Sequence, residues 1–161
     1  MSEHNDTKHQ QILDLERFLP YRLSILSNLI SGILADTYKD KFALTITEWR
    51  IMAVLGECAG ISADEISAKI NIEKSIISRA LQKLLSRHLV SREVDKVDRR
   101  RQNLNLTKVG LEIYQQLVPV AYSYENELLR CFSEEEQTQF NALLDRLYQH
   151  ADTVQLTKSD G

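Results

Sequence analysis

The most informative part of the chain is residues 62–107, SADEISAKINIEKSIISRALQKLLSRHLVSREVDKVDRRRQNLNLT. Ser62 and Glu65, three residues apart, form a capping box that opens a short helix. Asn71 is expected to cap a second helix over residues 73–87, whose apolar residues are spaced by three and four. Two short helices joined by about three residues predict a helix-turn-helix.

The spacing of apolar residues changes after this second helix. Residues 90–94 and 103–106 alternate between apolar and polar side chains, which predicts two short strands. The charged residues 95–101 lie between them and predict the tip of a β-hairpin. A hairpin that directly follows a helix-turn-helix is a wing, so the stretch predicts a winged helix-turn-helix.

Longer helices are expected on both sides of this core. An apolar stripe over residues 12–38 predicts a first helix with Pro20 near its start, and Thr47 is expected to cap the next one. After the hairpin, the pattern predicts a helix kinked at Pro119 and a last helix that opens with a capping box at Ser133. The predicted fold class is mainly α with a small β-hairpin wing (α+β).

The chain has a net charge of −3, but its charges are segregated. Residues 69–101 contain ten Lys and Arg against four Asp and Glu, a net charge of +6, so the remainder carries −9. This segment is therefore suited to an anionic partner. The sequence contains no apolar run long enough to span a membrane and no signal-peptide core, so we expect a cytoplasmic protein with no membrane partner.

The second helix of the helix-turn-helix has two opposite faces. At about 100° per residue, its apolar side chains fall on one face and its polar side chains on the other. The polar face carries Lys74, Ser75, Ser78, Arg79 and Gln82, with Ile76 at its edge. In a major groove, Arg binds guanine, Gln binds adenine, Ser contacts either base and Ile touches a thymine methyl. Taken alone, the pattern fits an ordinary solvated helix face at least as well.

The hairpin tip strengthens the DNA-binding interpretation. Arg99, Arg100 and Arg101 are expected to project from the tip, and a narrow minor groove attracts inserted Arg side chains. Asp98 is expected to hold one of these guanidinium groups through a bidentate pair. The expected partner is duplex DNA.

The stretch from Leu44 to Gly110 resembles the DNA-binding core of the MarR family. The matching pieces are Glu48-Trp49, Ser75, Ser78-Arg79, Leu89-Val90, Asp95, Asp98-Arg99-Arg100, Leu104-Asn105-Leu106-Thr107 and Gly110. The resemblance implies a homodimer whose first and last two helices interlock, and which binds a pseudo-palindromic operator with half-sites about 10 base pairs apart. His88 stands where the family usually has Gly, so we expect a slightly different turn into the hairpin.

These expectations divide the chain into five parts. They are a flexible N-terminus (1–11), an N-terminal dimerisation helix (12–43), a winged helix-turn-helix DNA-binding domain (44–110), C-terminal dimerisation helices (111–151) and a flexible tail (152–161).

A second resemblance concerns an effector. Residues 18–23, FLPYRL, resemble a MarR subgroup that controls the breakdown of aromatic acids, including hydroxycinnamates and their coenzyme A thioesters. This implies a repressor that a small aromatic carboxylate releases from DNA. Arg22 would pair with the carboxylate, and Ser27, Asn28 and Trp49 would line the pocket. The alternatives are a core position for Trp49 and a dimer contact for Arg22.

Other functions are less favoured by the sequence. Cys58 and Cys131 have neither disulfide nor metal spacing and are interpreted as buried apolar side chains, with a redox-responsive regulator as the alternative. The four His are scattered, so no metal site and no cofactor is expected. The chain lacks a phosphate loop, a nucleophile elbow and an HExxH motif, so we do not expect an enzyme. A winged helix that binds only another protein is a further alternative.

Overall fold

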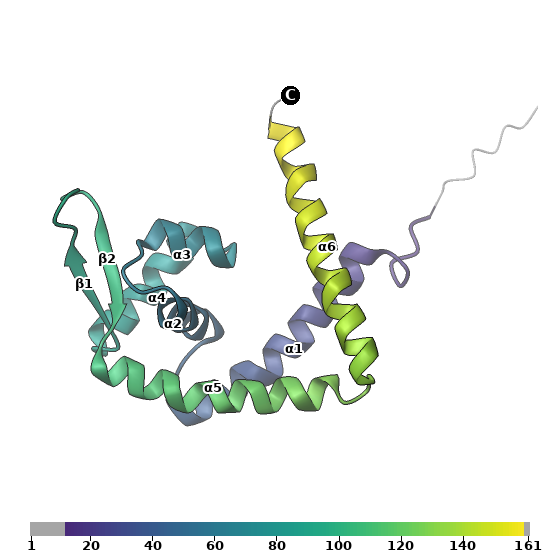
Figure 1. The fold of residues 1–161 in the computed structure, drawn as a ribbon, viewed down its shortest axis with the longest axis horizontal. Helices are drawn as coiled ribbons and strands as arrows, with labels where there is room; N and C mark the ends of the chain where they lie inside the picture. The colour runs from purple at the N-terminus through teal and green to yellow at the C-terminus, as the bar shows by residue number, and fades with distance from the viewer. Residues whose placement is uncertain (1–11, 160–161) are drawn as a thin grey trace, which may run out of the picture. The chain divides into compact units, whose positions relative to one another are not determined.

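The computed structural model describes residues 12–159, with side chains described to residue 154. Within it, six helices and one antiparallel hairpin follow in the order α1 (Leu19–Phe42), α2 (Ile46–Glu57), α3 (Ala63–Ile70), α4 (Lys74–Ser86), β1 (Val90–Val94), β2 (Gln102–Leu106), α5 (Lys108–Leu129) and α6 (Glu134–Ser159) (Figure 1). The predicted fold class is confirmed. The chain divides into two compact units, with the boundary between Tyr114 and Gln115 inside α5.

The start of α2 differs from the expected one. The helix begins at Ile46, and its N-cap is Thr45 instead of Thr47. The Thr45 hydroxyl accepts a hydrogen bond from the Glu48 backbone N–H at 3.2 Å, and the Glu48 carboxylate accepts one from the Thr45 N–H at 2.9 Å. Because a capping box needs an acid three residues after the hydroxyl, Thr45 and not Thr47 meets the requirement.

The helix-turn-helix itself forms as predicted, with one change in its turn. The capping box of Ser62 and Glu65 opens α3, as expected. Asn71, however, ends α3 in the left-handed conformation, with φ 51°, instead of capping α4. The N-cap of α4 is Glu73, which makes no side-chain capping bond. Asn accepts the left-handed conformation more readily than most residues, which explains its place in the turn.

The core of the first unit lies where α2, α3, α4 and the hairpin meet. Helix α2 is central to it, because it packs against α1, α3, α4 and β2. The buried apolar side chains of this core include Ile51, Met52, Leu55, Ile66, Ile77, Leu81, Leu84, Leu89, Val90 and Leu104. Helix α4 contributes one apolar face to this core.

The hairpin is anchored at its base. Val90 pairs with Leu106 and Val94 with Gln102, so β2 starts one residue earlier than expected. Leu104 also bridges to Ile61, in the loop before α3: the Leu104 N–H donates to the Ile61 carbonyl at 2.9 Å. The base of the hairpin is therefore fixed to the helix-turn-helix by backbone hydrogen bonds.

The link between α4 and the hairpin corrects the expectation for His88. His88 adopts the left-handed conformation that Gly usually occupies, with φ 55°. Its N–H donates to the Leu85 carbonyl and the Leu89 N–H donates to the Leu84 carbonyl, each at 3.0 Å, as in a Schellman motif. The turn is therefore the ordinary one, because the two hydrogen bonds offset the cost of a side chain at positive φ, roughly 1–2 kcal/mol.

A close approach explains the glycine at the start of α5. A Cβ atom at Gly110 would lie 1.9 Å from the carbonyl oxygen of Leu89, the residue that leads into β1. The same carbonyl accepts a hydrogen bond from the Thr107 N–H at 3.0 Å. Any larger residue at position 110 would separate the start of α5 from the hairpin.

In the second unit, α5 continues through Pro119 and is followed by α6. The capping box at Ser133 is confirmed, because the Ser133 N–H donates to Glu136 at 2.8 Å and the Glu136 N–H donates to the Ser133 hydroxyl at 3.2 Å. Helix α6 extends to Ser159, so the expected helix end at residue 151 was wrong. The sequence after residue 151 contains no Pro, and Gly only at position 161, to stop the helix.

Each unit exposes an apolar helix face. On α1 the exposed apolar side chains are Leu19, Leu23, Ile25, Leu26, Leu29 and Ile33. On α6 they are Leu143, Leu144, Leu147, Tyr148 and Val154. None of the described helices is long and apolar enough to cross a membrane.

Candidate nucleic-acid interface

The predicted recognition face lies on the solvent side of α4. Its six side chains, which are Lys74, Ser75, Ile76, Ser78, Arg79 and Gln82, are all exposed. The opposite face is buried through Ile77, Ala80, Leu81 and Leu84. Burial of one face fixes the rotation of α4 about its axis, so the polar face has no freedom to turn inward.

Lys74 has a partner within the chain. Its ammonium lies 3.0 Å from the Asp64 carboxylate of α3, and the two side chains are 73% and 70% exposed. An ion pair this exposed contributes little to stability, so a phosphate oxygen can replace the carboxylate at small cost. Lys74 therefore remains available to the recognition face.

Asp95 organises the tip of the wing. Its carboxylate accepts hydrogen bonds from the N–H groups of Val97 and Asp98, at 2.8 and 2.9 Å, and from the Asn103 amide at 2.8 Å. The bond from the Asp98 N–H, followed by those from Asn103 and Val97, lowers the pKa of Asp95 from 3.8 to about 2. The ionised carboxylate thus closes the turn that presents the arginines.

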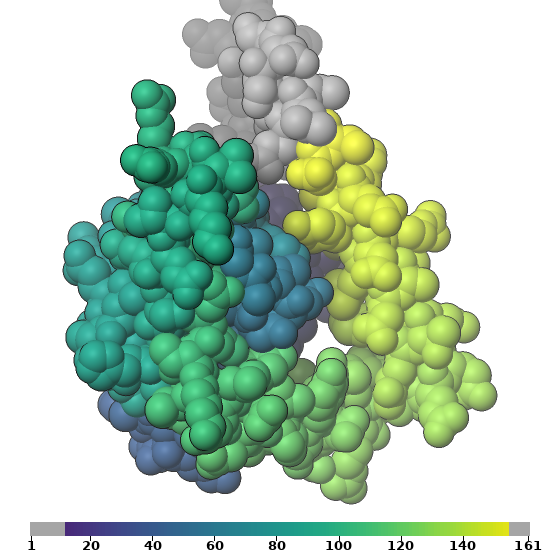
Figure 2. All heavy atoms as spheres, turned by 60° about the vertical axis from the view of Figure 1, so that its left-hand side comes forward, coloured from purple at the N-terminus to yellow at the C-terminus, as the bar shows by residue number. Residues whose placement is uncertain are grey.

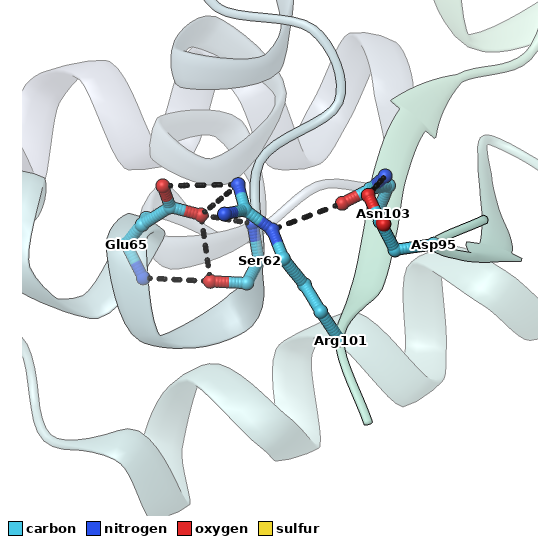
Figure 3. A network of polar contacts seen from close by, with 5 residues as sticks. All are labelled: Ser62, Glu65, Asp95, Arg101 and Asn103. Atoms are coloured by element: carbon cyan, nitrogen blue, oxygen red, sulfur yellow. Dashed lines mark hydrogen bonds and ion pairs between the residues drawn. The ribbon is translucent and has the colours of Figure 1, made fainter. Parts of the chain in front are cut away.

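The expected role of Asp98 was wrong. Its carboxylate does not hold a guanidinium group but accepts a hydrogen bond from the Arg100 N–H at 3.0 Å, within the turn. The guanidinium that is held belongs to Arg101, and its partner is Glu65 of α3, with Nη2 at 2.9 and 3.1 Å from the two carboxylate oxygens (Figure 3). Arg101 therefore does not project with the other two arginines, because a carboxylate far away in sequence lies within its reach.

Glu65 has two roles in this network. Its carboxylate accepts bonds from the Ser62 N–H and hydroxyl, each at 2.7 Å, which caps α3, and it also binds Arg101 of the wing (Figure 3). Hydrogen bonds from Ser62, first from its backbone and then from its side chain, lower the pKa of Glu65, and the charge of Arg101 adds to the effect. The sequence indicates the cap but not the contact with the wing, which joins residues 36 positions apart.

Two arginines of the tip remain directed to solvent. Arg99 and Arg100 are exposed, and no carboxylate of the described residues lies within ion-pair distance of them. Figure 2 shows the hairpin tip, in teal-green at the upper left, standing out from the rest of the first unit. The interface therefore combines the polar face of α4 with a protruding tip that carries two unpaired positive charges.

The residues predicted to bind an effector are not all brought together within one chain. Arg22, Ser27 and Asn28 are exposed on α1, whereas Trp49 is half-buried on α2. The Trp49 ring lies 5.1 Å from that of Tyr38 and 6.1 Å from that of Tyr114, measured between centroids. Because Arg22 precedes Tyr38 by 16 residues on the same helix, about 24 Å separate them along its axis. Arg22 and Trp49 therefore do not share one pocket within the chain.

Two polar groups where α1 meets α2 were missed by sequence reasoning. The Tyr38 hydroxyl is fully buried and has no hydrogen-bond partner among the described residues, and burial raises its pKa. Arg50 is half-buried, and its guanidinium donates to the neutral Ser31 hydroxyl at 3.4 Å. Arg50 directly follows Trp49, but the sequence offers no signal that it faces α1.

The two cysteines differ in exposure. Cys58 is half-buried at the end of α2, but Cys131 is exposed between α5 and α6, so its interpretation as a buried apolar side chain was wrong. Among the described residues, no group of three His, Cys, Asp or Glu side chains is placed to hold a metal ion.

Comparison with known proteins agrees with this geometry. Residues 44–101 match the profile of the MarR family. The HTH-type transcriptional regulator PecS of Dickeya dadantii is 33% identical over 142 residues, which cover 86% of this chain and 85% of PecS.

Solved structures show the same likeness. A MarR/EmrR family transcriptional regulator from Acinetobacter sp. ADP1 has a TM-score of 0.81 at 29% identity, over 88% of this chain and 99% of that one. The structure of an S. aureus MepR-DNA complex shares the fold, with a TM-score of 0.74 at 24% identity, over 83% of this chain and 98% of that one. This chain therefore belongs to the MarR family of winged-helix, DNA-binding transcription regulators.

Proposed function

We propose that this protein is a homodimeric transcription regulator that reads a pseudo-palindromic operator, with α4 in the major groove and the wing in the minor groove. Regulators of this family bind DNA and are not enzymes. The observation that carries the proposal is the exposed polar face of α4 beside a wing whose base is fixed to the same helix-turn-helix.

The chemistry of the α4 face supports direct reading of bases. Arg79 offers a planar pair of donors that suits O6 and N7 of guanine, and Gln82 offers one donor and one acceptor that suit N7 and the N6 amino group of adenine. Ser75 and Ser78 are short enough for the helix backbone to approach the groove closely. Lys74, at the first turn, is suited to a phosphate oxygen.

The wing supports a second, shape-dependent contact. Arg99 and Arg100 protrude on a turn that Asp95 and Asn103 hold closed. A narrow minor groove concentrates negative potential and attracts such guanidinium groups. Arg101 supports the wing from its side, through the ion pair with Glu65 of α3.

Homodimerisation is supported by the exposed apolar faces of α1 and α6. The apolar side chains of α1 are 40–63% exposed at Leu19, Leu23, Ile25, Leu26, Leu29 and Ile33, on a helix of 24 residues. Extended apolar stripes of this kind favour a protein partner. A second copy of the chain would cover them and would place two recognition helices in two-fold symmetry, as an inverted repeat requires.

The test is a mobility-shift titration with a duplex selected from a random pool by the full-length protein. We expect two chains per duplex, an affinity that falls steeply with salt, and a loss of about tenfold or more in Arg79→Gln, since a good base contact contributes about 1–3 kcal/mol. Lys39→Gln, which removes one exposed charge at the end of α1, is the matched control and should change affinity little. A protein that selects no duplex even at low salt would contradict the proposal and favour a protein-binding role.

The effector prediction is retained in a narrower form: we propose a small aromatic carboxylate that binds between α1 and α2. The buried, unpartnered Tyr38 hydroxyl, the Trp49 ring beside Tyr38 and the half-buried Arg50 guanidinium against Ser31 support this chemistry. Ser27 lies one turn before Ser31 on α1. Arg50 replaces Arg22 as the proposed carboxylate partner within one chain, while Arg22 and Asn28 remain predictions for the assembled protein.

The effector is tested by adding a panel of aromatic acids, including hydroxycinnamates, to the protein–DNA complex at fixed salt. Release by one acid should be lost in Arg50→Gln, whose DNA affinity without acid stays near that of the unaltered protein. Release that persists in Arg50→Gln but is lost in Arg22→Gln would restore the original assignment. A complex that no acid releases would contradict the effector class and leave DNA binding unaffected.

A further inference from the structure

Arg87 joins the ends of two helices that are distant in sequence. Its Nη1 donates to the Ala43 carbonyl at 2.7 Å and its Nη2 to the Phe42 carbonyl at 2.9 Å. Phe42 is the last residue of α1 and Ala43 is its C-cap, while Arg87 is the C-cap of α4. One side chain therefore ties the end of the recognition helix to the end of the first helix.

The local chemistry makes this tie specific for arginine. The last carbonyls of a helix lack partners within the helix. At the end of α1, the carbonyls of Tyr38 and Lys39 accept from the N–H groups of Leu44 and Ala43, respectively. Arg87 satisfies the carbonyls of the last helical residue and of the C-cap. The positive charge also suits the negative end of the helix dipole. A planar guanidinium fork donates to both carbonyls at once, which a lysine ammonium does not reproduce.

The apolar contacts of these helices do not provide the same restraint. Helices α1 and α4 both pack against α2. Burial against α2 fixes the rotation of α4 about its own axis, whereas the hydrogen bonds of Arg87 join the end of α4 directly to the end of α1. The two bonds of Arg87 therefore add a direct and directional restraint between α4 and the end of α1 to the packing that both helices make with α2.

We infer that Arg87 is a positioning residue that sets the separation of the two recognition helices, and hence the half-site spacing that the protein accepts. The inference rests on the proposed function, because it requires that α1 forms the dimer interface and α4 enters the groove. In such a dimer, any shift of α4 against α1 occurs twice, in opposite directions, and changes the distance between the two helices. Arg87 acts through this geometry and not by contacting DNA.

The experiment measures spacing discrimination in the full-length protein. The duplex selected by the unaltered protein is compared with duplexes in which one central base pair is inserted or deleted, which moves the half-sites by about 3.4 Å and turns them by about 35°. The readout is the ratio of the affinity for the selected duplex to the affinity for each altered duplex. A uniform loss of charge or of folded protein cancels from this ratio. Three variants are compared: Arg87→Gln, Arg87→Lys and Lys83→Gln. Lys83 is one turn earlier on α4, so its variant removes the same charge without touching the two carbonyls of α1.

We expect Lys83→Gln to keep the ratio of the unaltered protein, and Arg87→Gln to lower it by about threefold or more, in keeping with the loss of two charge-assisted hydrogen bonds. Arg87→Lys should give an intermediate ratio. A folded Arg87→Gln variant with an unchanged ratio overturns the inference. If Arg87→Gln does not fold, the Arg87→Lys variant provides the test. An unchanged ratio in Arg87→Lys overturns the inference, because the positive charge alone is then sufficient. A lack of any DNA binding by the unaltered protein would instead contradict the proposed function.

Discussion

The recognition helix and the wing are held in place by different kinds of contact. Helix α4 is held through an apolar face that includes Ile77, Leu81 and Leu84, all buried. The tip and side of the wing are held by polar contacts, with Asp95 closing the turn and Glu65 binding Arg101. Apolar burial is strong and insensitive to pH, whereas exposed hydrogen bonds and ion pairs are weaker and respond to pH and salt. The rigid element is therefore suited to reading bases, and the adjustable one to following groove shape.

The largest expected effect concerns the anchor of α4. Ile77→Ala should lower the free energy of unfolding by about 2–5 kcal/mol, because it leaves a cavity at a fully buried position. The matched control is Ile76→Ala, one residue earlier on the same helix and 44% exposed, which should change stability by about 0.5 kcal/mol or less. Urea denaturation measures both. Similar losses in the two variants would contradict the assignment of the faces.

The second effect concerns DNA binding by the wing tip. Arg100→Ala should weaken operator affinity about tenfold, or roughly 1.4 kcal/mol, while the urea midpoint stays unchanged, because the side chain contacts no core. Lys96→Ala removes a positive charge from the same tip and serves as the control for general electrostatic attraction. Titrations at two salt concentrations separate the cases. Equal losses in the two variants would mean that the tip acts only as a diffuse charge.

A smaller effect should follow from separating the wing from α3. Glu65→Gln and Arg101→Gln should each weaken operator affinity on the order of a few-fold, since the pair is partly exposed. The double variant should lose no more than the larger single loss, because both changes remove the same restraint. Operator titrations of the three variants complete the cycle. Strictly additive losses would show that the contact between Glu65 and Arg101 does not position the wing.

The smallest effect is a dependence of stability on pH that originates in the wing. The folded pKa of Asp95 is about 2, below its ordinary value of 3.8, so the ionised carboxylate stabilises the fold above pH 3.8 and this contribution is lost as the pH falls towards 2. Asp95→Asn keeps one carbonyl acceptor and removes the titration. Thermal unfolding should therefore show a steeper loss of stability between pH 4 and pH 2 in the unaltered protein than in the variant. Parallel curves would remove Asp95 from the acid response.

Sequence reasoning was most successful where one local pattern sets one element. The capping boxes at Ser62 and Ser133 and the apolar spacing of α4 each depend on residues within a few positions of one another. It was less accurate where two local patterns compete. Thr45 and Thr47 both offer a hydroxyl, and Asn71 fits either a helix start or a left-handed helix end.

Local sequence patterns therefore predict the order of helices and strands, the polar face of α4 and the arginine-bearing tip, because side-chain periodicity and capping act over short distances. Three contacts of long charged side chains depend on the folded chain: Arg101 of the tip with Glu65, Arg87 with the end of α1, and Arg50 with Ser31. Each of these contacts joins residues 19 to 45 positions apart. A long charged side chain reaches many places, and only the packing of the apolar core determines which carboxylate, hydroxyl or carbonyl lies within its range.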